Sequence, residues 1–206
     1  MATESAKTVI DAIKCRRSIR HYKADALPKA AIEHLLDAAR YAPTALGKQT
    51  CNFLVVTNKT VLKQVGAILQ GRLEFGLRWR PILKWFVKSL RDPEVARIGK
   101  RLREEKRDIV FYDAPCVVFF LAKAYESYGE ADCLLAAQNL MVAAQAMGIG
   151  SVMLGTVLMA NRLSQARAFL RIPSDYQIRC VVALGYSDEP VRDLPERKDN
   201  MLGWVE

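Results

Sequence analysis

An unbroken apolar run, CVVFFLA at 116–122, most constrains the fold of this chain of 206 residues. Its β-branched and aromatic residues favour a β-strand, and the absence of alternating polar residues indicates that both faces of the strand are covered. A strand of this kind lies inside a sheet that has other elements packed against it. We therefore expect a layered α/β or α+β fold in which helices cover the sheet.

Helical and strand-like patterns alternate on either side of this run. Helices are expected at 9–13, 29–41, 60–69, 131–147 and 161–170, and further strands at 52–57, 151–154 and 177–184. The helix at 131–147 has more apolar surface than one sheet face can cover. The remainder could form a subunit interface, or the helix could be the central helix of a monomer, and the periodicity does not separate these two interpretations.

The chain contains no linker rich in glycine, serine or proline and no visible repeat, so we expect one domain over 1–206. No apolar run reaches the roughly 18 residues that span a bilayer, and the N-terminus lacks the apolar region of a signal peptide. These patterns predict a cytoplasmic protein. The five cysteines are widely spaced without a CxxC pair, which favours reduced thiols and gives no support to a metal site.

The net charge of +9 is concentrated in one part of the chain. Residues 72–107 contain twelve Lys or Arg against five Asp or Glu, a net +7, while the rest of the chain is close to balanced. A basic surface favours anionic ligands such as nucleotides, and it is also compatible with nucleic acid or an anionic membrane.

A second concentration of charge lies near the N-terminus, where Arg16, Arg17, Ser18 and Arg20 occur within five residues. Guanidinium groups this close together are costly to hold unless an anion lies among them. Taken alone, such a string is also compatible with a solvated helix end. Its function therefore depends on whether other segments can complete an anion site.

Three distant segments are candidates for that role. The loop APTALGKQ at 42–49 and the run GIGSVMLG at 148–155 contain glycines that allow a flat ligand to approach the backbone closely. Near the C-terminus, Gly185 and Tyr186 follow the last expected strand, and Arg197 and Lys198 add two cations.

Together these segments resemble the FMN-dependent nitroreductase-like flavoproteins. The resemblance rests on AIKCRRSIRHY at 12–22, AARYAPTALGKQ at 38–49, AAQNLMVAAQAMGIGSVMLG at 136–155 and ALGYSDEPVRDLPERK at 183–198, which occur in the order of that family. It implies an α+β, three-layer fold with a central, mostly antiparallel sheet flanked by helices. It also implies an intertwined homodimer with FMN bound at the interface.

The resemblance assigns roles to individual residues. The FMN phosphate and the ribityl or pyrimidine edge would be held by Arg16, Arg20 and Ser18. Arg17 would add backbone contacts or charge, and Arg197 would close on the phosphate. The residues that would approach the flavin from the partner subunit are Pro43, Thr44, Ala45, Gly47 and Gln49. Met153, Leu154 and Gly155 would lie along the ring near N5. No catalytic side chain is expected, because flavin N5 carries the chemistry.

The chain departs from the family pattern in two places. Gly47 replaces an asparagine common in relatives, and Thr50-Cys51 replaces a common Pro-Trp, so the wall facing the substrate is expected to differ. The basic segment at about 71–108 is a variable region in the family, and we interpret it as a lid in which Trp79, Trp85 and Phe86 line the substrate pocket. Pro81 disfavours one continuous interfacial helix, so membrane association is not the favoured interpretation.

The predicted function is hydride transfer from NAD(P)H through FMN to an electron-poor acceptor such as a nitroaromatic, quinone or activated alkene, by a ping-pong mechanism. The alternative is a flavin-binding protein without nicotinamide turnover, which uses its basic middle segment to bind an anionic partner or a membrane. A nucleic-acid-binding module would account for the charge but leaves the glycine- and proline-containing loops unexplained.

Overall fold

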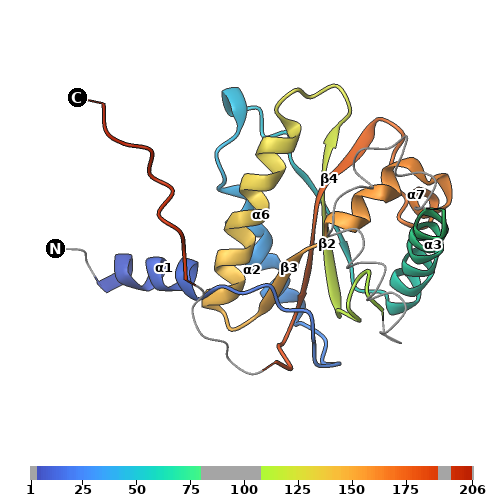
Figure 1. The fold of residues 1–206 in the computed structure, drawn as a ribbon, viewed down its shortest axis with the longest axis horizontal. Coiled ribbons are helices and arrows are strands. Elements are labelled where there is room, and N and C mark those ends of the chain that lie inside the picture. The colour runs from blue at the N-terminus through green and yellow to red at the C-terminus, as the bar shows by residue number, and fades with distance from the viewer. Residues whose placement is uncertain (1–3, 80–107, 190–195, 206) are drawn as a thin grey trace.

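The central element of the fold is an antiparallel sheet (Figure 1). The computed structural model describes residues 4–79, 108–189 and 196–205, with side chains from residue 8 onward. Within these residues the sheet has four strands in the order β1-β2-β4-β3, and every neighbouring pair is antiparallel. The strands are β1 (Asn52–Val56), β2 (Cys116–Lys123), β3 (Gly150–Met153) and β4 (Tyr176–Gly185).

Helices cover both faces of this sheet (Figure 1), which confirms the expected three layers. One layer contains α2 (Lys29–Arg40) and α6 (Gly129–Ala146), and the other contains α3 (Lys59–Arg78), the 3₁₀ helix η3 (Gly155–Arg162) and α7 (Ser164–Phe169). In β2, Val118 and Phe120 pack toward α6, while Val117 and Phe119 pack toward α3. All four side chains are fully buried, so the apolar run at 116–122 is a strand covered on both faces, as its composition predicts.

Two terminal segments project from this layered body (Figure 1). Helix α1 (Glu4–Cys15) contacts α6, and its apolar residues Val9 and Ile13 are at least half exposed. The C-terminal residues 196–205 extend away from the sheet, and the side chains of Leu202 and Trp204 are exposed. Both segments therefore present apolar side chains to solvent in a single copy of the chain.

The helix expected at 161–170 differs from the structure. The chain forms η3 up to Arg162, adopts an extended backbone at Leu163 (φ −117°, ψ 100°), and only then begins α7. The side chain of Asn161 exchanges two hydrogen bonds of 2.8 Å with the backbone of Ile178 in β4. This tertiary contact fixes the chain next to the sheet, and apolar periodicity alone does not reveal it.

The remaining expected elements are confirmed, with boundary changes of at most two residues except in α1 and α3. Helix α1 begins at Glu4 and ends at Cys15, whereas the expected helix covered only 9–13. Helix α3 is longer than expected, because it continues to Arg78. Among the described helices, none combines the length and the apolar character needed to cross a membrane.

Candidate functional site

The arginine-rich segment lies directly beside β3. The backbone N–H of Ile19 donates a hydrogen bond of 3.0 Å to the carbonyl oxygen of Ser151, and Ser18 forms an isolated parallel bridge with the same residue. Gly150 makes this approach possible, because a Cβ there would lie only 3.0 Å from Cγ2 of Ile19. The arginine-rich segment and the run at 148–155 are thus brought together by direct contact.

The same N-terminal segment also pairs with the chain that follows β4. The Lys23 N–H donates to the carbonyl oxygen of Tyr186, and the Asp188 N–H donates to that of His21, each across 3.0 Å. The backbone N–H of Arg20 donates to Oε1 of Glu189 across 2.8 Å. The segment that follows β4 therefore starts beside the arginine-rich segment, which also contacts the run at 148–155.

The three guanidinium groups of this segment have different surroundings. Nη1 of Arg17 donates hydrogen bonds of 2.8 Å to the carbonyl oxygens of Lys14 and Arg16, which satisfies acceptors at the C-terminal end of α1. The Arg20 guanidinium lies 6.0 Å from the ring centre of Tyr112. Nη1 of Arg20 also donates to the carbonyl oxygen of Ser18, but across 3.4 Å, so Arg17 is held more closely by the backbone than Arg20 is.

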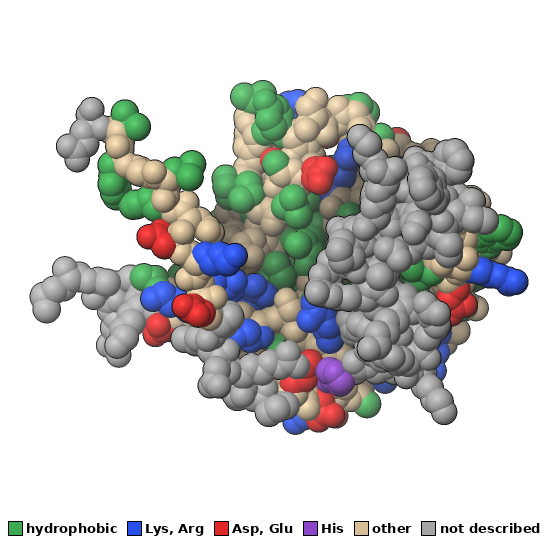
Figure 2. Space-filling view, in the orientation of Figure 1, with side chains coloured by type: hydrophobic (Ala, Val, Ile, Leu, Met, Phe, Trp, Pro, Cys, Tyr) green, Lys and Arg blue, Asp and Glu red, His purple; other side chains and the backbone are tan. Residues whose placement is uncertain are grey.

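Arg16 is half-buried and lies close to another cation from the far end of the chain. Burial lowers the pKa of Arg16, and the positive charges of Arg197 and Arg17 lower it further. In the part of the chain that the structure describes, neither Arg16 nor Arg197 forms an ion pair with a carboxylate. Figure 2 shows Lys and Arg side chains gathered at the base of the projecting C-terminal segment. A half-buried cation with an exposed one nearby forms a site whose charge favours an anion.

The end of β3 supplies the surface next to these cations. The Met153 side chain is 50% exposed, and Gly155 is exposed at the start of η3. Leu154 points the other way, because its side chain packs in the core and its N–H donates to the carbonyl oxygen of Val181 across 2.8 Å. Only the backbone of Leu154 is therefore available beside the arginine segment.

The predicted loop at 43–49 lies at the other end of α6. Its residue Ala45 is hydrogen-bonded to Asp132 in the first turn of α6, whereas the arginine segment contacts Gly150, just beyond the last turn. At 1.5 Å per residue, Asp132 and Gly148 are separated by about 24 Å along the helix. A single copy of the chain therefore does not bring this loop to the arginine segment.

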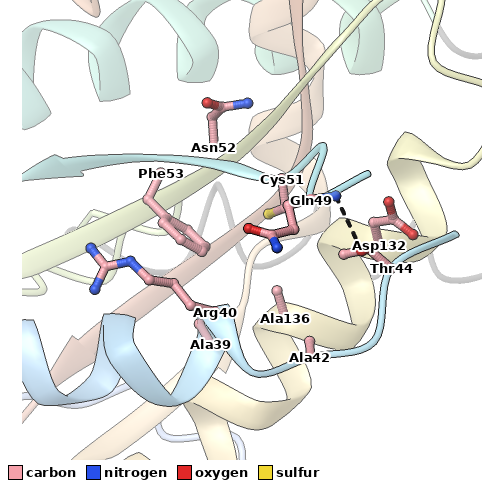
Figure 3. Close-up of a pocket in the computed structure, with 10 residues that line it drawn as sticks. All are labelled: Ala39, Arg40, Ala42, Thr44, Gln49, Cys51, Asn52, Phe53, Asp132 and Ala136. Carbon is pink, nitrogen blue, oxygen red and sulfur yellow. Dashed lines mark hydrogen bonds between the residues drawn. The ribbon is translucent and has the colours of Figure 1, made fainter. Parts of the chain in front are cut away.

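The loop itself has an unusual backbone. Leu46, Gly47 and Gln49 have φ values of 56°, 65° and 51°, a region that favours glycine. The N–H of Gln49 donates to Oγ1 of Thr44 across 3.1 Å, as the dashed line in Figure 3 shows. Residues of the loop, α2, β1 and α6 line an open pocket of about 300 Å³, among them Arg40 and Phe53 (Figure 3).

Asp132 is a residue of this region that the sequence patterns did not single out. It is 2% exposed, and its carboxylate accepts hydrogen bonds from the Ala45 N–H at 3.0 Å and from Oγ1 of Thr50 at 2.6 Å. The available signal was a carboxylate on an otherwise apolar helix face, because a buried charge requires partners.

The predicted substrate-pocket residues are only partly covered by the structure. Trp79 ends α3, is 46% exposed, and its ring lies 6.5 Å from that of Phe75. Helix α3 is on the opposite face of the sheet from α6 (Figure 1). Trp85 and Phe86 lie outside the described residues, as does most of the segment 71–108.

Comparison with known proteins identifies the family. The model of the nitroreductase family matches residues 13–186, which include the arginine segment, the loop, β3 and β4. The chain belongs to the nitroreductase family. It is 29% identical over 197 residues to a protein of Methanothermobacter thermautotrophicus provisionally named NADH dehydrogenase/NAD(P)H nitroreductase, with 94% of this chain and 86% of that protein covered. It is also 26% identical over 196 residues to an iodotyrosine deiodinase of Danio rerio, with 89% of this chain and 62% of that protein covered.

A solved nitroreductase structure shows the same fold. The nitroreductase of Bacteroides fragilis NCTC 9343 superposes with a TM-score of 0.77 at 25% identity, and the match covers all of both chains. That structure contains bound FMN.

Proposed function

We propose that this nitroreductase-family chain is a single-domain FMN oxidoreductase. Bound FMN would supply the chemistry, accepting hydride from NAD(P)H at N5 and passing it to an electron-poor acceptor such as a nitroaromatic, quinone or activated alkene in a ping-pong sequence. The five free cysteines are those of a protein in a reducing compartment, which supports a cytoplasmic location.

The observation that carries this proposal is the half-buried Arg16 in the segment that the Ile19–Ser151 hydrogen bond holds against β3, with the charge of Arg197 nearby. FMN carries a phosphate dianion, and guanidinium groups bind phosphate with charge-assisted hydrogen bonds. The pKa of Arg16 is lowered by burial and by neighbouring cations. A phosphate site has the same two features. The donors available in this structure therefore fit the phosphate. We place the flavin ring beside the exposed Met153 and Gly155, with Arg20 and Ser18 toward its ribityl or pyrimidine edge.

We infer that the complete site needs a second copy of the chain. The loop at 43–49 is about 24 Å along α6 from the arginine segment, so only the loop of another copy can face the same ligand. Several exposed apolar side chains support a homodimer, because water would leave them on association. They lie on α1, on α6 and on the C-terminal segment: Val9, Ile10, Ile13, Leu134, Leu135, Leu202 and Trp204.

The cofactor site can be tested by comparing FMN with riboflavin, which lacks the phosphate. We expect Arg16→Ala and Arg197→Ala each to weaken FMN binding about tenfold or more, since each removes a charged hydrogen-bond donor, and to leave riboflavin binding unchanged. Lys63→Ala is the matched control, because it removes an exposed positive charge from α3, on the face of the sheet opposite α6, and should leave FMN binding unchanged. Equal FMN affinity in the wild type and in both of these variants would contradict the assigned phosphate site.

The enzymatic function can be tested by mixing the FMN-loaded protein with NADH or NADPH without oxygen. Loss of the visible absorbance of oxidised flavin, followed by its return on addition of an acceptor, is the expected result. Nitrobenzene, a quinone and 3-iodotyrosine form the acceptor panel, the last because a relative is named for deiodination of iodotyrosine. A bound chromophore that neither donor bleaches would favour the alternative of a flavin-binding protein without nicotinamide turnover, which binds an anionic partner or a membrane.

A further inference from the structure

Asp132 is a buried carboxylate whose two oxygens hold the two ends of one loop. Oδ1 accepts the N–H of Ala45 and Oδ2 accepts the hydroxyl of Thr50, while the side chain is 2% exposed. Each bond joins residues more than 80 positions apart in the sequence, at separations of 87 and 82 residues. The carboxylate lies in the first turn of α6, where the helix dipole favours negative charge.

The loop between these two bonds has a backbone that needs external support. Leu46 and Gln49 have positive φ values, although neither is glycine. Residues in such conformations persist where surrounding contacts hold them. The bond from the Gln49 N–H to Thr44 lies within the loop, so it does not attach the loop to the rest of the protein.

Among the described residues, the loop has two further polar contacts outside itself. Nδ2 of Asn52, the next residue but one, donates to the carbonyl oxygen of Thr50 across 2.9 Å, and the other contact is long-range. Nζ of Lys48 lies 3.6 Å from Oε2 of Glu126, but the lysine side chain is 54% exposed. Ion pairs at the surface contribute little, because water and salt screen them. Asp132 is therefore the buried attachment of the loop to α6.

We propose that Asp132 is a positioning residue for the cofactor, acting through the loop 44–50. Its carboxylate fixes both ends of the loop, and the loop then presents the 88% exposed side chain of Leu46 and the exposed backbone of Gly47 to the ligand. This inference rests on the proposed function, in which that loop contacts FMN bound to a second copy. It adds a residue that never touches the flavin itself.

Three variants separate this role from a general contribution to stability. Asp132→Ala removes both bonds. Asp132→Asn keeps one carbonyl acceptor for the Ala45 N–H, and its amide can donate to the Thr50 oxygen if that hydroxyl turns. Thr50→Val removes only the bond to Oδ2 and keeps the shape of the side chain. Glu130→Ala is the matched control, because it removes an exposed acid from the same helix turn without touching the loop.

The measurements are the FMN dissociation constant and the visible circular dichroism of the bound flavin, taken on folded dimer. We expect FMN affinity to fall about tenfold or more in Asp132→Ala, since hydrogen bonds to a charged group are lost, and less in Asp132→Asn and Thr50→Val. The flavin dichroism should change in the same order and return toward the wild-type spectrum in Asp132→Asn. Glu130→Ala should match the wild type in both measurements.

Two results would overturn the proposal, and they are distinguishable. If the wild type binds FMN and a folded Thr50→Val or Asp132→Ala protein keeps its affinity and dichroism, the positioning role is wrong while the proposed function stands. If the wild type binds no FMN, the proposed function fails and the positioning role fails with it. Should Asp132→Ala not fold, Thr50→Val and Asp132→Asn carry the same test.

Discussion

The backbone N–H of Ile19 is hydrogen-bonded to the carbonyl oxygen of Ser151 across 3.0 Å. This bond lies between the arginine-rich segment near the N-terminus and a strand in the second half of the chain. It places Arg16 and Arg20 beside the exposed end of β3, where Met153 and Gly155 lie. The candidate ligand site in one copy of the chain depends on this contact.

A side chain at Gly150 is predicted to crowd that contact. A Cβ at Gly150 would lie 3.0 Å from Cγ2 of Ile19 and 3.1 Å from the carbonyl oxygen of Gly185. We expect Gly150→Ala to lower the free energy of unfolding by about 1–3 kcal/mol through crowding, and to weaken FMN binding because the arginine segment moves. Urea denaturation and FMN titration measure the two effects.

Gly71→Ala is the matched control for this substitution. Gly71 lies within α3, and a Cβ there meets no atom within 4 Å, so alanine should increase stability by about 0.5–1 kcal/mol. A Gly150→Ala protein as stable as Gly71→Ala, with unchanged FMN affinity, would show that the close approach is not needed.

Asn58 is predicted to stabilise the start of α3. Its Oδ1 accepts hydrogen bonds from the N–H groups of Thr60 at 2.9 Å and Val61 at 3.2 Å, which satisfies two of the free donors of the first helical turn. Asn58→Ala should cost about 1 kcal/mol, and Asn58→Asp should keep most of the stability, since both caps accept the same bonds. Urea denaturation of the three proteins checks this order, and equal stability of Asn58→Ala and wild type would contradict the capping role.

The cysteines are predicted to react with thiol reagents in two classes. Cys15 is exposed and Cys51 is partly exposed, whereas Cys116, Cys133 and Cys180 are buried. Burial raises the pKa of Cys116 to about 12, which removes the reactive thiolate at neutral pH. Labelling of the native protein at neutral pH, followed by peptide mass spectrometry, should modify Cys15 first and leave the three buried thiols intact until denaturant is added. Rapid native labelling of Cys116 would contradict the described core.

The stability of the protein is predicted to fall at alkaline pH. Burial raises the pKa of both Cys116 and Cys180 to about 12, so the folded chain keeps these thiols protonated at a pH where the unfolded chain releases the protons. The contribution of these thiols to the free energy of unfolding is therefore complete below the ordinary thiol pKa of about 8.5. It decreases as the pH rises from there toward 12. Each thiol changes the free energy of unfolding by up to about 1.4 kcal/mol per pH unit in that window.

Urea denaturation between about pH 8 and about pH 11 measures this slope. Cys133 is also buried with a raised pKa, so Cys116→Ala removes one of several such thiol protons and should give a flatter pH dependence than the wild type. An identical slope in the two proteins would show that the Cys116 thiol does not titrate differently on unfolding.

Much of the fold could be predicted because its signals are local. The apolar run at 116–122 indicated a doubly covered strand, and periodicity indicated α2 and α6 with boundaries within two residues. The helix expected at 161–170 begins only at Ser164, after η3 and the extended Leu163, and the Asn161 side chain binds the backbone of Ile178 on another element. Apolar spacing contains no information about a contact of that kind.

The candidate site also has a part that could be predicted from the sequence and a part that could not. The composition of the Arg16–Arg20 segment indicated an anion site, and the order of four motifs indicated the family, before any contact was known. Leu154 was expected along the flavin; its side chain is buried in the core, so only its backbone is available for such a contact, which the motif alone does not reveal. Asp132 was not predicted, because its importance depends on two partners that only the folded chain brings to it.

The sequence by itself therefore determined the layers of the fold, the family and the concentration of charge, because these follow from the type and spacing of neighbouring residues. Only the tertiary structure decided that Arg16 lies near Arg197 and that the loop 44–50 is attached to Asp132. It also decided that the length of α6, about 24 Å, separates this loop from the arginine-rich segment. Those relationships depend on how distant elements pack around the sheet, which no local pattern specifies.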